Sequence, residues 1–344
     1  MEIVGDSLDD LLVDLYPALL SKPVKNYGRR GETSEIVGVA LKLQKPRARI
    51  SRSENRGKLF SALGELLWHL SGSDNLDFIK KYLPVYSQEA TAGVIRGAYG
   101  PRLLRMRGKI NQIQNVCKLL NTNPGSRRAV IQLFNAEDIV SDYKEIPCTT
   151  TLQFLVRENR LHLSVTLRSN DAYLGLPHDI FCFTMLQEMM ACRLNVDLGC
   201  YYQYVGSMHI YECHQSRARA YLAEGHQRVI EMPPMPAGDP FALVPCLLEA
   251  EKRLRYGQKV SASDMISIGY WSDIIRLLQV YWRSDDSDFL NELKRGFCDP
   301  IYLPYLEARQ GMMPPPACES TLSRFVRQSR LAYSGIKRLM RWER

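Results

Sequence analysis

The ten residues Arg168–Pro177, RSNDAYLGLP, join two segments of different character. Leu161–Leu167 precedes them and alternates apolar with polar residues, which is the period of a β-strand. Ile180–Arg193 (IFCFTMLQEMMACR) follows them and is strongly apolar, as a buried helix is. We therefore expect a strand that leads into a helix, with arginine, serine and aspartate side chains at the junction.

A cysteine upstream of this junction is the first candidate for chemistry. Cys148 follows Pro147 and stands between a polar loop and a predicted strand, Thr151–Val156. A single cysteine is more often a packed thiol than a nucleophile. Three further motifs reverse that expectation here: ELLW at 65–68 on a predicted helix (57–70), SRR at 126–128 in a turn, and HIY at 209–211 at the end of a predicted strand (201–209).

Composition limits the class of protein. The chain has 344 residues, 45% of them apolar, which is enough for one large domain or two smaller ones. Its nine cysteines, an odd number without a CxxC pair, predict neither a disulfide framework nor a zinc site. The N-terminal segment is acidic, and no apolar run reaches the roughly 20 residues that span a bilayer. We expect a cytoplasmic protein without a membrane segment.

The formal charge of +8 leaves two interpretations open. The excess is either an ordinary basic surface or a sign of phosphate or nucleic acid as a ligand. Much of it lies after Ser320, in a predicted helix at 322–342. A charged helical tail is more often a solvated face than a nucleic-acid element, so we do not expect nucleic-acid binding.

In their order along the chain, these five motifs resemble the thymidylate synthase family, from about Arg30 to about Glu224. The resemblance implies an α+β fold with a mixed sheet, and a homodimer formed through that sheet. It also implies a pyrimidine nucleoside monophosphate as substrate and 5,10-methylenetetrahydrofolate as one-carbon donor. The punctuated linker Pro233–Pro240 divides the chain into a catalytic domain, residues 1–232, and a mostly helical C-terminal extension, residues 233–344.

The chemistry of this family explains the residue types. C5 of a pyrimidine is a poor nucleophile, and addition of a thiolate at C6 converts the ring into an enamine or enolate that attacks through C5. The resemblance assigns the thiolate to Cys148. It assigns proton transfer around the base and folate to Glu65, a carboxyl on an apolar helix face whose burial needs a reason. It also implies folate contacts by Asp171, Gly175 and Glu65.

The resemblance further implies a cluster that binds the 5′-phosphate, because a guanidinium donates hydrogen bonds in a fork that fits phosphate. Within one subunit its members are Arg168, Ser169 and a loop arginine, Arg30 in preference to Arg29. Arg127 and Arg128 are implied to reach the phosphate of the other subunit. His209 and Tyr211 are implied to hydrogen-bond the 3′-hydroxyl of the sugar.

Two residues after Pro177 the sequence departs from the uracil-specific members. Those members have an asparagine whose carbonyl accepts from N3–H of uracil and whose NH₂ donates to O4, whereas this chain has Asp179. Cytosine reverses both requirements. A carboxyl matches them, as an acid with neutral cytosine or as a carboxylate with cytosine protonated at N3. Asp179 therefore implies CMP or dCMP as substrate, as in the family's cytidylate hydroxymethylases; neutral drift in a uracil enzyme is the alternative.

Other departures favour a hydroxymethyl product over a methyl product. The segment VYSQEATAGVIRGAYG (85–100) lacks the family's tryptophans, His178 replaces an aromatic residue, and residues 233–344 do not resemble the family's short closing segment. A less sealed pocket lets water reach an exocyclic methylene before hydride does. The extension would restore the seal if it placed a tryptophan over the folate; the candidates are Trp271, Trp282 and Trp342.

Two other functions stay open from the sequence. One is C5 methylation of CMP, dCMP or dUMP on the same fold. The other is a catalytically inactive paralogue that binds nucleotides or nucleic acid, against which the joint presence of Cys148, Glu65, Arg168 and Asp171 argues. The sequence leaves ribose and deoxyribose undecided.

Overall fold

The computed structural model describes residues 1–318 except 22–24, 29–30 and 52–57. Its centre is a mixed sheet with strand order β1-β3-β7-β6-β5-β4, and β2 pairs with β3. β1 runs parallel to β3 and β6 parallel to β7, while the other pairs are antiparallel. The strands are β1 (Glu2–Gly5), β2 (Lys25–Gly28), β3 (Gly31–Leu43), β4 (Val130–Gln132), β5 (Thr149–Arg157), β6 (Arg160–Asp171) and β7 (Asp197–Tyr211). The predicted α+β fold with a mixed sheet is confirmed.

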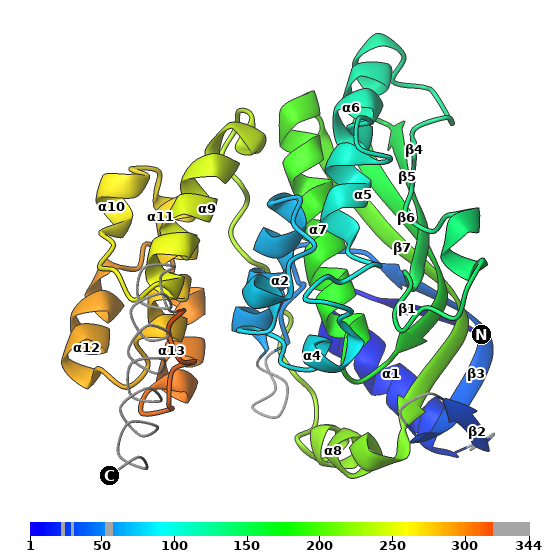
Figure 1. Cartoon of the computed structure of the whole chain (residues 1–344), viewed down its shortest axis with the longest axis horizontal. Helices are drawn as coiled ribbons and strands as arrows, with labels where there is room; N and C mark the ends of the chain where they lie inside the picture. Colours follow the sequence, from blue (N-terminus) through cyan, green and yellow to red (C-terminus); the bar gives the residue numbers. More distant parts are fainter. Residues whose placement is uncertain (22–24, 29–30, 52–57, 319–344) are drawn as a thin grey trace, which may run out of the picture.

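Helices cover one face of this sheet (Figure 1). Those that share a core with the strands are α1 (Leu8–Ser21), α5 (Tyr99–Arg105), α6 (Gln112–Thr122), α7 (Gly175–Leu194) and α8 (Glu212–Ala223). Two short helices, α3 (Leu76–Ile79) and α4 (Tyr86–Glu89), lie in the connection that leads to α5. Helix α2 (Leu59–Leu70) packs against α7 and lies between α7 and the C-terminal helices (Figure 1).

The β5–β6 hairpin brings Cys148 next to Arg168. Its turn is formed by Glu158 and Asn159, whose φ angles are 51° and 58°, and Arg157 already pairs with Arg160. The sequence predicts this turn at Asn159 and Arg160, one residue later. Two adjacent residues with positive φ form the turn that matches the twist of a hairpin. At the far end, the backbone N–H of Arg168 donates to the carbonyl of Cys148 at 2.9 Å.

Helix α7 begins at Gly175, five residues before the predicted start. Pro177 stands in its first turn, where backbone N–H groups have no partner inside the helix, so the missing proline donor costs little. The earlier start carries Asp179 into the second turn of α7, directly after the polar junction.

The C-terminal region is helical, as predicted. It contains α9 (Val244–Arg255), α10 (Ala262–Met265), α11 (Gly269–Trp282), α12 (Ser287–Gly296) and α13 (Leu303–Arg309). The single helix predicted over Ser261–Tyr281 is divided, because the backbone at Ile266 is extended. Residues 225–239 contain no helix or strand, and the predicted domain boundary at 232/233 falls among them and stays a prediction. The predicted helix at 322–342 and Trp342 lie outside the described residues.

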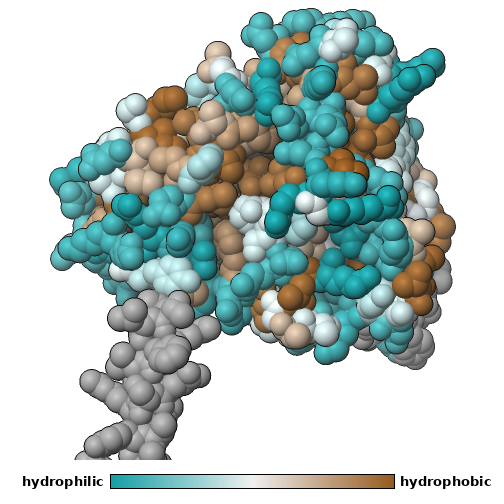
Figure 2. Space-filling model, turned by 45° about the horizontal axis from the view of Figure 1, so that its top comes forward, coloured by the Kyte–Doolittle hydropathy of each residue, from teal (hydrophilic) through white to brown (hydrophobic). Residues whose placement is uncertain are grey.

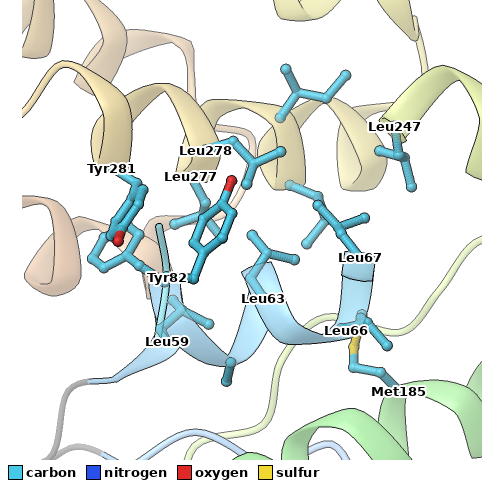
Figure 3. Packing of buried hydrophobic residues seen from close by; sticks show 14 of the residues in the cluster. Leu59, Leu63, Leu66, Leu67, Tyr82, Met185, Leu247, Leu277, Leu278 and Tyr281 are labelled. Carbon is cyan, nitrogen blue, oxygen red and sulfur yellow. The ribbon is translucent and has the colours of Figure 1, made fainter. Parts of the chain in front are cut away.

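The C-terminal helices bury the outer side of α2. Figure 3 shows leucines of α2 directed toward α11 and α9; they are Leu59, Leu63 and Leu67, opposite Leu277, Leu278, Tyr281 and Leu247. Tyr82 stacks on Tyr281 with ring centroids 4.9 Å apart, and its hydroxyl donates to Glu251 and accepts from the indole of Trp282, each at 2.9 Å. A band of hydrophobic residues marks the junction of the two regions on the surface (Figure 2).

No helix in the described part of the chain is long and apolar enough to cross a membrane. The cytoplasmic location expected from the sequence stays a prediction.

Candidate active site

A cavity of ≈ 630 Å³ lies where β5, β6 and β7 meet the start of α7. Helix α2 and the segment 83–99 form its other wall. Most of the residues that the sequence singled out line it; they are Glu65, Cys148, Arg168, Ser169, Asp171, Gly175, Asp179, His209 and Tyr211. The hairpin, the α7 junction and α2 are distant in sequence, so the fold brings them together.

Cys148 immediately precedes β5, is half-buried and faces this cavity. An Nη of Arg168 lies 3.7 Å from its sulfur, and Nε of the same guanidinium donates to the carbonyl of Pro147 at 2.9 Å. The second bond holds the cation against the thiol, and a neighbouring cation favours the thiolate form that acts as a nucleophile. The hydroxyl of Tyr99 accepts from the N–H of Thr149 at 3.1 Å and fixes the backbone beside the sulfur.

Other cysteines have surroundings that suppress reactivity. Burial raises the pKa of Cys182 well above its ordinary value, and raises that of Cys117 and Cys192 to about 11. Cys182 points its thiol at the carbonyl of Ala62 and lies in the core between α2 and α7. Since only the thiolate is a good nucleophile, these three have a structural role.

Ser169, His209 and Tyr211 lie on neighbouring strands at the same end of the cavity. The register pairs Ser169 with Ser207 and Asp171 with His209. Oγ of Ser169 lies 3.5 Å from Nδ1 of His209, and the rings of His209 and Tyr211 meet edge to face at 5.3 Å. The arrangement puts hydroxyl, imidazole and phenol groups near Arg168, as a nucleotide sugar and its phosphate require.

The remaining arginines of the predicted phosphate cluster are not part of this cavity. Arg127 and Arg128 are exposed, and neither lines it. Arg29 and Arg30 lie outside the described residues. Within the described part of one chain, Arg168 is therefore the arginine of the predicted cluster that reaches the cavity, next to Ser169.

Glu65 is a buried carboxyl on the cavity side of α2. Its relative exposure is 8%, and it accepts a hydrogen bond from the hydroxyl of Tyr86 at 2.8 Å. Burial raises the pKa of Glu65 to about 7, although the Tyr86 bond opposes the shift. A carboxyl that titrates near neutrality can both donate and accept a proton, which suits a general acid–base.

Asp179 is a second carboxyl of the cavity with a raised pKa, and it is half-buried. One of its oxygens, Oδ2, accepts from the side-chain amide of Asn170 at 2.6 Å. Burial, followed by the charge of Glu65, raises the pKa of Asp179 to about 8, while the Asn170 bond lowers it. At neutral pH the protonated form therefore predominates, and Asp179 can donate a hydrogen bond into the cavity.

The junction residues fit the predicted folate contacts. Oδ1 of Asp171 accepts from the N–H groups of Tyr173 and Leu174 at 2.8 and 3.1 Å, while its Oδ2 is buried and has no partner among the described residues. A buried, unpaired carboxylate oxygen calls for a donor from a ligand. Gly175 packs closely on Asn170, since a Cβ there would lie 3.2 Å from the amide nitrogen.

The two tryptophans of the extension that the structure describes do not line this cavity. Trp271 and Trp282 are buried in the C-terminal core, and the wall facing Glu65 is formed instead by residues such as Leu83, Pro84 and Tyr86. His178 lines the cavity with both ring nitrogens engaged: Nδ1 donates to the carbonyl of Leu174 at 2.9 Å, and Nε2 lies 2.9 Å from Oγ of Ser61.

Sequence reasoning missed three polar residues around the site. Tyr86 lies in the segment that was noted only for lacking tryptophan. Asn170 lies within RSNDAYLGLP, and Gln203 occupies a buried position of β7 behind it. The signal for Gln203 was available, because a polar residue at the buried phase of an alternating strand requires a partner.

Comparison with known proteins assigns the class of this fold and cavity. The thymidylate synthase family model matches residues 30–235, more than half of the 344 residues. The chain therefore belongs to the thymidylate synthase family, as the motifs predicted.

Individual relatives include both methylating and hydroxymethylating enzymes. The chain is 33% identical over 178 residues to a thymidylate synthase of Francisella tularensis, covering 47% of this chain and 65% of the relative. It is 31% identical over 215 residues to a deoxyuridylate hydroxymethyltransferase of Bacillus phage SP01, covering 57% of this chain and 56% of the relative. The chain thus spans less than two thirds of the first relative's length and just over half of the second's.

Proposed function

We propose that this protein catalyses folate-dependent C5 hydroxymethylation of a cytidine nucleotide, CMP or dCMP, through a covalent bond from Cys148 to C6. The observation that carries the proposal is a half-buried carboxyl, Asp179, that lines the same cavity as Cys148 and has its pKa raised to about 8. A neutral carboxyl donates to N3 of cytosine and accepts from its N4 amino group.

Different residues act in different steps of the proposed reaction. Cys148 adds to C6, and the ring electrons then form the bond from C5 to the transferred carbon. When bound, 5,10-methylenetetrahydrofolate supplies that carbon at the oxidation level of formaldehyde, and Asp171 with its unpaired Oδ2 would hold it together with Gly175. Glu65 accepts and returns protons near the base, for which its pKa of about 7 is suited.

The final step decides between two products. Loss of the C5 proton and of tetrahydrofolate leaves an exocyclic methylene on the base, which takes up either water or hydride. Addition of water, followed by expulsion of the Cys148 thiolate, gives the 5-hydroxymethyl nucleotide. The wall near Glu65 carries the polar groups of Tyr86, Glu89 and His178, which favour an ordered water there.

A homodimer is part of the proposal. Arg127 and Arg128 are exposed and away from their own cavity, which supports their donation to the cavity of a partner. Exposed apolar side chains alternate with buried ones along three strands, which places them on the sheet face opposite the helices; they are Val4, Val130 and Tyr204. This face supports a dimer formed through the sheet.

A second candidate is hydroxymethylation of dUMP. The phage SP01 relative, a deoxyuridylate hydroxymethyltransferase, favours it. The protonation of Asp179 bears on this candidate. An ionised carboxylate accepts from N3–H of uracil but offers no donor to O4, whereas a neutral carboxyl can match either base, according to which oxygen carries the proton.

One experiment separates these functions. The full chain is incubated with methylenetetrahydrofolate and each of CMP, dCMP, UMP and dUMP in turn. The mass of each nucleotide product is then measured by mass spectrometry. We expect a cytidine nucleotide to gain CH₂O without formation of dihydrofolate, which is followed by near-ultraviolet absorbance. A gain of CH₂ with stoichiometric dihydrofolate would mean methylation, and product only from uracil nucleotides would exclude the cytosine assignment.

A further inference from the structure

A chain of buried polar side chains runs from the sheet to Asp179. The hydroxyl of Tyr201 donates to Oε1 of Gln203 at 2.6 Å, and Nε2 of Gln203 donates to Oδ1 of Asn170 at 3.2 Å. Nδ2 of Asn170 then donates to Oδ2 of Asp179 at 2.6 Å. Tyr201 and Gln203 are wholly buried and Asn170 is 3% exposed. Asp179 and Asn170 line the cavity, whereas Tyr201 and Gln203 lie behind them; we call Tyr201, Gln203 and Asn170 the relay.

The hydrogen bonds of the relay have one favoured direction of donation, and Tyr201 determines that direction. Reversal would turn both amides over, so that Gln203 would donate to the Tyr201 oxygen. The Tyr201 proton would then have no acceptor among the described residues, in a place without access to water. A buried donor left without a partner is disfavoured by about tenfold or more in population.

The direction matters because a carboxylic acid alone does not choose between bases. It can carry its proton on either oxygen, so it can present donor and acceptor in either order. One order matches the N3 and N4 edge of cytosine, and the other matches the N3 and O4 edge of uracil. Donation by Asn170 makes Oδ2 an acceptor and leaves the proton to Oδ1, which has no hydrogen-bond partner in the described part of the chain.

We propose that Tyr201, Gln203 and Asn170 are positioning residues that set base specificity by fixing Oδ2 of Asp179 as the acceptor and Oδ1 as the donor. The identity of the preferred base, cytosine, rests on the proposed function. The existence of a preference for one base does not. Gly175 also helps to position Asn170, because a Cβ at Gly175 would lie 3.2 Å from the side-chain amide nitrogen of Asn170.

The relay changes the outcome expected for Asp179→Asn. From the residue alone, an asparagine should move the preference from cytosine to uracil, as in the uracil-specific members. With the relay intact, Asn170 still needs an acceptor, so the new amide presents its oxygen at the Oδ2 position and its NH₂ at the Oδ1 position. That is the same order as the protonated Asp179, and the preferred base stays the same.

The test compares CMP with UMP, and dCMP with dUMP, in the full-length protein. Ratios of kcat/KM and of nucleotide Kd without folate are measured for wild type, Asp179→Asn, Tyr201→Phe and the double variant. Tyr201→Phe removes one oxygen and keeps the packing, and Tyr256→Phe, at an exposed position directly after α9, is the matched control. We expect Tyr201→Phe to reduce the preference by about tenfold, the value of one hydrogen bond.

The outcomes separate the relay from the proposed function. We expect Asp179→Asn to keep the wild-type preference and the double variant to lose it. Reversal of preference by Asp179→Asn alone, or an unchanged ratio in Tyr201→Phe, would overturn the relay. A wild type that prefers uracil would overturn the cytosine assignment, yet loss of that preference in Tyr201→Phe would still support the relay.

Discussion

At the residue scale, Cys148 and Cys182 differ in surroundings. Cys148 faces the cavity beside Arg168, whereas Cys182 is buried with its pKa raised. We expect Cys148→Ala to reduce kcat by more than about a thousandfold while circular dichroism and Tm stay near wild type. Cys182→Ala, the control, should stay active and lose about 1 kcal/mol of stability. Substantial product from Cys148→Ala would remove the covalent mechanism.

The protonation of Asp179 gives a second prediction at this scale. Its pKa of about 8 lies above the ordinary carboxyl value, so the neutral acid is present below pH 8 and is lost above it. Affinity for CMP or dCMP should therefore fall above pH 8, approaching about tenfold per unit. Calorimetric titration without folate measures this.

Two variants identify the titrating group. Asp179→Asn should bind with no pH dependence above pH 7, because its amide does not ionise. Glu65→Gln removes the neighbour that titrates near pH 7 and should keep a fall in affinity, moved to lower pH. Wild-type affinity that stays flat to pH 9.5 would contradict the role of the neutral acid.

At the element scale, α2 depends on a glycine that the sequence gave no reason to notice. A Cβ at Gly64 would lie 2.1 Å from Cγ of Tyr82, whose ring lies flat on the helix and bonds to Glu251 and Trp282. We expect Gly64→Ala to lower the free energy of unfolding by about 2 kcal/mol, because overpacking forces Tyr82 out of place. Urea titration measures the loss.

Gly125→Ala provides the control for Gly64→Ala. A Cβ at Gly125 meets one atom, Oδ1 of Asn123 at 3.6 Å, which is an ordinary contact. Its stability should stay within about 0.5 kcal/mol of wild type. Equal effects of the two substitutions would show that the Tyr82 contact is unimportant.

The elements also show what a sequence pattern can predict. The apolar period located α2 to within two residues, and alternation located β5, β6 and β7, because each pattern reflects burial on one side. The start of α7 and the break at Ile266 were missed, since they depend on backbone hydrogen bonds rather than on burial. Most of the predicted site residues line one cavity, but the hydrogen bonds from Tyr201 and Gln203 toward Asp179 depend on the pairing of β6 with β7, which the sequence pattern does not contain.

At the scale of the whole molecule, the phosphate cluster supplies the fourth prediction. Cys148→Ala and Arg127→Ala homodimers should each be weakly active. Mixing them under subunit exchange should restore up to about a quarter of wild-type activity per site, because exchange makes half the dimers mixed and each mixed dimer has one site free of both lesions. Activity after exchange, with mixed dimers verified by mass spectrometry, measures this. A monomer in solution, or verified exchange without rescue, would count against donation in trans.

Helix α2 has the cavity on one side and the C-terminal helices on the other, and all of its residues except Ser61 are buried. Such a helix leaves little freedom for neutral change. A substitution in α2 that improves packing against the extension is selected against if it displaces Glu65. A substitution near Glu65 is selected against if it disturbs the leucines that contact α11. Over evolutionary time, substitutions in the extension and in α2 should therefore be correlated. Relatives that lost the extension should also have replaced the leucines of α2 that contact it.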